Sequence, residues 1–85
     1  MNTEQLVERL IAFAEAGNQQ KIQLANGSII QGWVMEITDE ALLISSGYSD
    51  KVGKDQWITH QDLITAELVY WDNKNDTWAV FHLND

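Results

Sequence analysis

The sequence predicts a mainly β domain in which an N-terminal helix is followed by a small barrel of five or six strands. Apolar residues recur at helical spacing over residues 3–16, and from Lys21 onward the period changes to two. Turn residues then separate several short apolar segments, as in small barrels and sandwiches. The 85 residues predict one domain over 1–85, with the helix in 1–18 and the barrel in 21–83.

The predicted helix runs from about Thr3 to Ala16. Thr3 is the expected N-cap, and Glu4 lies near the positive end of the helix dipole. Gly17-Asn18 is a stop signal, because either residue adopts the left-handed conformation that ends a helix. The helix has a single apolar stripe, formed by Leu6, Val7, Leu10, Ile11, Phe13 and Ala14.

Turn chemistry and alternation predict the strands. Asn26-Gly27 is typical of a tight hairpin, because both central positions of such a turn need positive φ. Gly32 interrupts the long second strand, where glycine permits the bend that curls a sheet into a barrel. Residues 72–76 are a turn that can fold the last strand back onto the fifth. The six predicted strands cover residues 21–24, 28–37, 41–44, 56–60, 64–71 and 77–83.

The net charge of −8, from 13 acids and 5 bases, disfavours nucleic acid as a partner and predicts no DNA binding. The absence of cysteine excludes a disulfide framework, a thiolate metal site and a cysteine nucleophile. No apolar run approaches 18 residues and no secretory signal is recognisable. We therefore expect a cytoplasmic protein without a membrane segment.

No pattern of an enzyme is found: there is no phosphate-binding loop, no nucleophile beside a base, and no cluster of metal ligands. Oxygen donors gather in the turn over residues 72–76. Lys74 occupies a position that should carry a calcium ligand, and the required glycine and glutamate are missing. The prediction is a protein without catalytic residues, metal or cofactor.

The order of the elements resembles the Sm/Lsm family. The resemblance is carried by residues 22–27, Gln31-Gly32, Ile37 and residues 42–44, and more weakly by residues 58–60 and Ile64. It spans about residues 3–71. It implies an Sm-like (SH3-like) barrel, RNA binding, and rings in which the fifth strand of one subunit pairs with the fourth of its neighbour.

The residues that this resemblance implies for RNA contact are largely replaced. In the turn after the second strand the family has an Asp, a large apolar or aromatic residue and, in one branch, an Asn. Those positions hold Thr38, Ala41 and Leu42 here. In the fourth-strand motif, Thr59 stands where the family has a basic residue. Only His60 is shared with the bacterial branch of the family.

Each candidate contact residue has a structural alternative. His60 is either a binding residue or a half-buried strand histidine with a backbone partner. Trp71 and Trp78 form either an exposed platform or a pair across the last hairpin. Candidates for contact with RNA or a partner are His60, Trp33, Lys51 and Lys54. Candidates for an interface are Tyr70, Trp71, Trp78 and Phe81.

Asp50 and Asp55 neutralise the local basic cluster of Lys51 and Lys54, which is expected to be a mobile loop. If residues 77–83 pair with the fifth strand, they occupy the edge that the usual ring needs. The chain is then a monomer, a dimer, or a ring built through a different edge.

Three hypotheses of function follow. The first is a non-catalytic Sm-like module, of bacterial or phage type, that acts through protein–protein or self-assembly contacts. The alternative is a divergent Sm-like RNA-binding protein, which rests on the family resemblance alone. The most remote is an acidic inhibitor or immunity-type protein that mimics nucleic acid.

Overall fold

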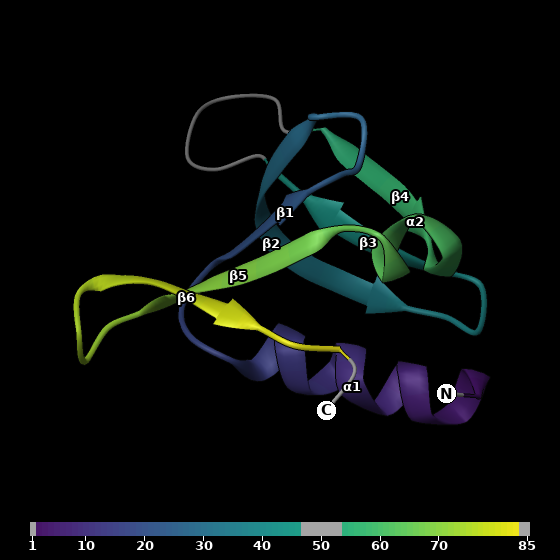
Figure 1. The fold of residues 1–85 in the computed structure, drawn as a ribbon, viewed down its shortest axis with the longest axis horizontal. Coiled ribbons are helices and arrows are strands. Elements are labelled where there is room, and N and C mark those ends of the chain that lie inside the picture. Colours follow the sequence, from purple (N-terminus) through teal and green to yellow (C-terminus); the bar gives the residue numbers. More distant parts are fainter. Residues whose placement is uncertain (1, 47–53, 84–85) are drawn as a thin grey trace.

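Six antiparallel strands form one sheet in the order β4-β3-β2-β1-β5-β6 (Figure 1). The computed structural model describes residues 2–46 and 54–83. The mainly β prediction is confirmed, and the strand pairings describe an open sheet with β4 and β6 at its two ends. The elements are α1 (Thr3–Glu15), β1 (Gln20–Gln23), β2 (Ile29–Ile37), β3 (Ala41–Ser45), β4 (Asp55–Thr59), α2 (His60–Ile64), β5 (Glu67–Asp72) and β6 (Thr77–Phe81).

The N-cap of helix α1 lies one residue earlier than predicted. Asn2, not Thr3, is the N-cap: its side-chain oxygen accepts a hydrogen bond from the backbone N–H of Gln5 at 2.8 Å. The side-chain oxygen of Gln5 accepts in return from the backbone N–H of Asn2 at 3.1 Å. This reciprocal capping box satisfies two of the donors that a helix start leaves unpaired, which is why the cap moves to Asn2.

The first hairpin joins β1 to β2 through a longer loop than the sequence predicts. Gly27 N–H donates to the carbonyl of Leu24 at 2.9 Å, and Leu24 N–H donates to the carbonyl of Ser28 at 2.8 Å. Gly27 has φ of +92°, whereas Asn26 is not among the residues with positive φ. The expectation that both positions need positive φ is therefore wrong. Asn26 instead accepts from Ser28 N–H through its side chain.

The long strand β2 pairs with β1 through its first half and with β3 through its second half. Gly32 lies opposite Gln20 of β1, and the next residue, Trp33, lies opposite Ser45 of β3. A Cβ atom at Gly32 would come within 2.0 Å of the Ser45 carbonyl oxygen. Gly32 is thus required because the backbone of β3 approaches it closely at the point where β2 changes partners.

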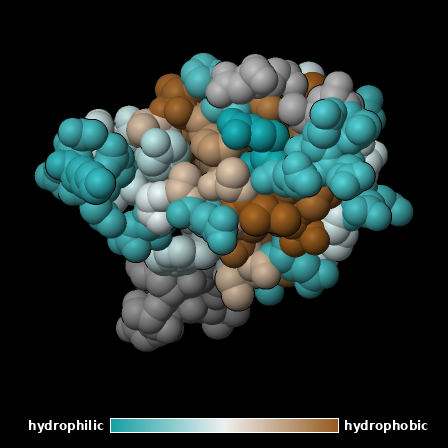
Figure 2. Space-filling model, turned by 90° about the horizontal axis from the view of Figure 1, so that it is seen from below, coloured by the Kyte–Doolittle hydropathy of each residue, from teal (hydrophilic) through white to brown (hydrophobic). Residues whose placement is uncertain are grey.

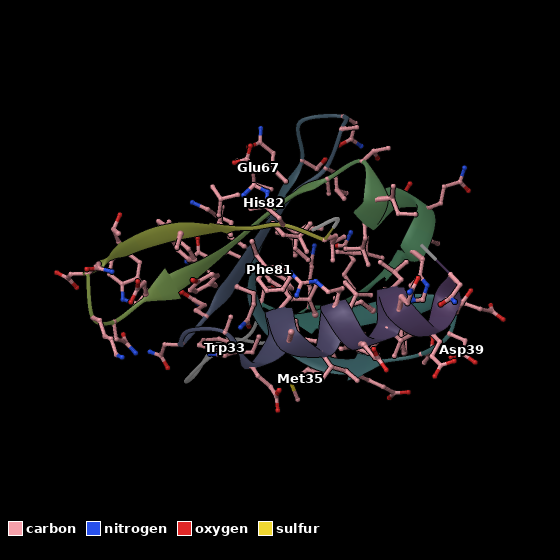
Figure 3. The ribbon with its side chains drawn as sticks, turned by 60° about the horizontal axis from the view of Figure 1, so that its bottom comes forward. Trp33, Met35, Asp39, Glu67, Phe81 and His82 are labelled. Atoms are coloured by element: carbon pink, nitrogen blue, oxygen red, sulfur yellow. The ribbon has the colours of Figure 1, made fainter. Side chains whose placement is uncertain are left out.

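The core lies between α1 and the inner face of the curved sheet. The helix contributes Leu6, Leu10 and Phe13, all buried. In the view of Figure 3, α1 crosses the front of the molecule, with Met35 labelled below it and Glu67 and His82 labelled above it. The remaining buried core residues come from the sheet, α2 and the C-terminal segment: Ile22, Leu42, Ile44, Ile58, Leu63, Leu68 and Leu83.

The fourth and fifth strands are shorter than predicted where they face each other along the chain, whereas the helical turn that residues 61–63 allow is present. The expected strand over residues 56–60 ends at Thr59, and His60 opens the short helix α2. The Thr59 hydroxyl accepts from Asp62 N–H at 3.2 Å and so caps this helix. Strand β5 consequently begins at Glu67 rather than at Ile64.

The last strand folds back onto the fifth, as the sequence predicts. Thr77–Phe81 pairs antiparallel with Leu68–Asp72, and Trp78 lies opposite Trp71. The connecting turn is held by Asp72, whose carboxylate accepts from Lys74 N–H at 2.9 Å and from the Asn75 side-chain amide at 2.8 Å. Asp76 has φ of +55°, a conformation that aspartate tolerates better than most residues.

Candidate interaction surface on the outside of the sheet

Alternation along β1, β5 and β6 divides their side chains between two faces. Ile22 and Leu68 point to the inner face and are buried in the core. Lys21 lies opposite Val69, and Val69 lies opposite Val80, so these three share the other face. We call this second surface of β1, β5 and β6 the outer face.

A groove on the outer face has an apolar floor and mixed polar sides. Val69 is buried within it, whereas Ile29 is 60% exposed and Val80 is 55% exposed. Its volume of about 290 Å³ is at the lower end of the range for clefts that hold small molecules. The groove therefore suits a few side chains of a partner. It is lined by Lys21, Gln23, Ile29, Glu67, Val69, Trp78 and Val80, and we call it the outer groove.

Trp78 is held in place from two sides. Its ring packs edge-to-face against Trp71, with the ring centroids 5.4 Å apart and the planes at 76°. The Lys21 ammonium lies 4.3 Å from the centroid of the Trp78 ring, which is a cation–π contact between β1 and β6. These contacts fix an aromatic wall of the outer groove before any partner binds.

The four residues predicted as an interface are divided between the two faces. Trp71 and Trp78 form the predicted cross-strand pair on the outer face. Tyr70 and Phe81 are half-buried and pack against the core, with their ring centroids 6.5 Å apart. Phe81 also packs against Phe13 of α1 at 5.3 Å. Only the two tryptophans are therefore available on the outer face.

His60 and Trp33, two of the predicted contact residues, both bind the backbone. His60 is half-buried, and its Nε2 donates to the carbonyl oxygen of Thr38 at 2.9 Å. Trp33 is half-buried, and its Nε1 donates to the carbonyl oxygen of Asn18 at 3.1 Å. The first hydrogen bond joins α2 to the turn after β2, and the second joins β2 to the segment before β1. Neither His60 nor Trp33 lies in the outer groove.

The predicted basic cluster is only partly described. Lys51 lies outside the described residues, together with Asp50. Lys54 and Asp55 are exposed at the start of β4, far along the sheet from the outer groove. Lys54 is therefore not among the residues that line the outer groove, where Lys21 is the cation among the described lining residues.

The two carboxylate oxygens of Asp72 accept hydrogen bonds within the turn over residues 72–76. The Asn75 side-chain amide, which donates to Asp72, lowers the pKa of that carboxylate, and the backbone N–H of Lys74 lowers the pKa further. Across residues 2–46 and 54–83, no group of three His, Asp or Glu side chains is arranged to hold a metal ion.

Apolar side chains are also exposed away from the outer groove. Ile11 of α1 is 44% exposed and Met35 of β2 is 63% exposed. Figure 2 shows apolar side chains in the middle of the face that carries α1, with hydrophilic ones around them. A shallow hollow at the start of α1 is acidic, with Glu4, Glu8 and Asp39 among its lining residues.

Sequence reasoning missed most of the outer groove. Ile29, Val69 and Val80 each stand in a segment that was correctly expected to be a strand, and alternation assigns them a face. What was missing is the pairing of β1 with β5, which are more than 40 positions apart and meet through the register Lys21–Val69. Without that pairing, Lys21 has no visible connection to Trp78.

No protein-family model, curated protein or solved structure was found to match this chain. In the described part of the chain, neither helix is long and apolar enough to cross a membrane.

Proposed function

We propose that this chain is a non-catalytic Sm-like module that acts through contacts with proteins, and that the outer groove is its contact surface. The observation that carries the proposal is the exposed apolar lining at Ile29 and Val80, which lies on the side of the sheet opposite the core. Exposed apolar patches bordered by polar residues are typical of interaction sites. Aromatic residues such as Trp78 are enriched at the centres of protein interfaces.

The polar rim suits a protein partner as well. Lys21 and Glu67 bring opposite charges to the same groove, together with the amide of Gln23. Such a rim pairs with side chains of either sign and gives orientation more than affinity. Because Trp78 is already fixed by Trp71 and Lys21, binding requires little further ordering of the aromatic wall.

The positions at which the Sm resemblance implies RNA contacts have structural roles instead. The Thr38 hydroxyl accepts from Ala41 N–H at 3.0 Å, and Leu42 is fully buried. Thr59 caps α2, and His60 donates to the Thr38 backbone. RNA recognition needs exposed stacking surfaces and free donors, so this use of the side chains supports a protein partner over RNA.

Site-specific photo-crosslinking tests the proposal. A photoreactive residue is placed at position 80 in the outer groove, and at position 61 of the exposed face of α2 as the matched control. We expect discrete protein adducts from position 80 inside cells that express the chain, and none of comparable yield from position 61. Equal yields at the two positions would contradict the proposal.

A titration with RNA separates the protein-binding proposal from the RNA alternative. Short U-rich and A-rich RNAs are mixed with the protein at about 50 mM salt, where electrostatic attraction to phosphates is strong. We expect no micromolar binding. Micromolar binding that weakens when Lys54 is replaced by Gln would instead support a divergent RNA binder.

A further inference from the structure

The edge strand β6 lacks the features by which natural edge strands avoid pairing with other chains. Charged side chains, proline and bulges usually protect such edges. Thr77–Phe81 reads Thr-Trp-Ala-Val-Phe, with no charge and no proline, and it pairs with β5 without a register shift. The opposite edge strand, β4, begins with the charged Asp55 and leads directly into α2.

The hydrogen bonds of β5 reveal which backbone groups of β6 remain unpaired. Trp71 N–H donates to Gln19 at 2.9 Å and the Trp71 carbonyl accepts from Asn18 at 3.1 Å, so Trp71 bonds toward the β1 side. In an antiparallel ladder, residues alternate between bonding to one neighbour and to the other. Across from Trp71, therefore, Trp78 directs its N–H and C=O away from β5, and so does Val80.

The remaining residues of β6 bond to β5. Ala79 lies opposite Tyr70 and Phe81 lies opposite Leu68, at the positions where the ladder closes its hydrogen bonds. The free groups of β6 thus belong to the two residues on either side of Ala79. This arrangement is its own complement when a second strand of the same sequence runs antiparallel.

We propose that a second copy of this chain pairs with β6 through β6, around a two-fold axis at Ala79. Trp78 of one copy then faces Val80 of the other, and each such pair exchanges two hydrogen bonds. The two copies of Ala79 meet at the closely spaced position between these pairs, where a small side chain fits. This inference rests on the proposed function, because it extends the same outer groove.

Pairing through β6 joins the outer grooves of the two copies. Trp78 and Val80 point to the outer face, so the tryptophan of each copy lies beside the valine of the other. Their apolar surfaces are then covered along the seam. Since β6 carries no charged side chain, pairing of the two copies of β6 brings no like charges of this strand directly opposite one another.

The helix leaves the start of this edge accessible. Its contacts with β6 are at the far end, where Phe13 and Arg9 meet the ring of Phe81. Figure 1 shows the β5–β6 turn extending away from α1, on the left of the view. Thr77 and Val80 are both exposed.

Light scattering and amide hydrogen exchange on the unmodified protein test the proposal. We expect a dimer whose mass falls toward that of the 9.7 kDa chain on dilution. We also expect the amide protons of Trp78 and Val80 to gain protection as the protein concentration rises. The amide of Ala79, which bonds to β5 in either state, is the internal control and should be protected at all concentrations.

A proline variant tests the hydrogen bonds directly. Val80→Pro removes a donor that points away from β5, and Val80→Thr keeps this donor with a side chain of similar size. We expect the dissociation constant of the dimer to rise roughly tenfold or more for Val80→Pro relative to Val80→Thr. If Val80→Pro does not fold, the exchange experiment on the unmodified protein still decides the proposal.

Three results would overturn the dimer: a monomer at all concentrations, a ring larger than a dimer, or Trp78 and Val80 amides that exchange equally fast at low and high concentration. The proposed function can fail separately. A monomer that still forms discrete protein adducts from position 80 refutes the dimer and leaves the outer groove as a contact surface. A dimer without adducts to other proteins limits the contacts of the groove to self-assembly.

Discussion

Several side chains that the sequence marks as candidates for contact with a partner form hydrogen bonds within the fold instead. His60 is the histidine that the sequence marked as a contact candidate. Its ring donates to the Thr38 carbonyl, which joins the start of α2 to the end of β2. The side chains of Thr59 and Thr38 also bond to the backbone, but as acceptors: their hydroxyl oxygens accept from the N–H groups of Asp62 and Ala41. These residues therefore act within the fold.

Replacing His60 by Ala should lower the free energy of unfolding by about 0.5–1.5 kcal/mol, because one hydrogen bond to the backbone is lost. His82→Ala is the matched control: its side chain is exposed, and the change should be within about 0.5 kcal/mol. Urea denaturation of both variants and the unmodified protein measures the difference. Equal stability of the two variants would contradict the structural role of His60.

For single residues, the sequence indicates which positions have a special structural role better than it indicates the contacts that explain this role. Gly32 was correctly identified as a special position in the second strand, but its reason is the Ser45 carbonyl oxygen, which belongs to another strand. The N-cap is Asn2 rather than Thr3 because Asn2 and Gln5 exchange two hydrogen bonds between side chain and backbone. A capping preference assigned to single residues does not include such a reciprocal pair. Contacts between distant segments are the information that is missing.

The hairpin of β5 and β6 is the element that both proposals depend on. The rings of Trp71 and Trp78 pack edge-to-face, and the ammonium group of Lys21 on β1 lies over the Trp78 ring. The sequence predicted the turn and the tryptophan pair, because both depend on residues close together in the chain. The contact with Lys21 depends on the pairing of β1 with β5 and was not predictable from local pattern.

A double-mutant cycle should detect the tryptophan pair. With Trp71→Ala, Trp78→Ala and the double variant, we expect a coupling energy of about 0.5–1.5 kcal/mol, as edge-to-face aromatic pairs give. The cycle of Trp71 with Trp57 is the control, since Trp57 lies on β4 at the other end of the sheet. Its coupling should be close to zero. Comparable coupling in both cycles would refute a specific pair.

The turn of this hairpin should be sensitive to acid. The pKa of Asp72 is lower in the folded chain than its ordinary value of about 3.9. The carboxylate therefore contributes stability that is present above pH 4 and is lost as the pH falls through the lowered pKa. Asp72→Asn removes this contribution at every pH.

The measurement is urea denaturation of the unmodified protein and of Asp72→Asn at pH 6 and at pH 3 or below. We expect the unmodified protein to be the more stable at pH 6, and the difference to shrink in acid. Asp39→Asn is a carboxylate control, because Asp39 is exposed and lies outside this turn and outside both helices. A difference that stays constant with pH would show that the Asp72 charge has no part in the turn.

The whole molecule carries its acidic excess on a small body, with 13 acids and 5 bases in 85 residues. Mutual repulsion of these charges opposes the compact state, and salt screens it over a Debye length of about 10 Å at 0.1 M.

The mainly β class followed from alternation and turn residues alone. The order of the strands required the structure, since two of the neighbours, β1 and β5, are distant in the chain.

Added sodium chloride should therefore stabilise the fold. We expect the midpoint of thermal unfolding to rise as salt increases from about 0.02 M to about 0.5 M. The double variant Glu4→Gln/Glu8→Gln, which removes two exposed acids on one face of α1, should show a smaller rise. A midpoint that falls with salt would indicate that attractive ion pairs outweigh the repulsion.

The contact between α1 and the far end of the sheet has a consequence for how the chain folds during synthesis. Arg9 donates to the backbone of His82, 73 positions later, and Phe13 packs against Phe81. Closing a loop of this length costs entropy before any contact compensates, so this contact is expected to form after the contacts of α1 with β1 and β2. Until β6 has left the ribosome, the apolar stripe of the helix lacks part of its cover. The nascent chain is then most prone to aggregate at the segment that was made first.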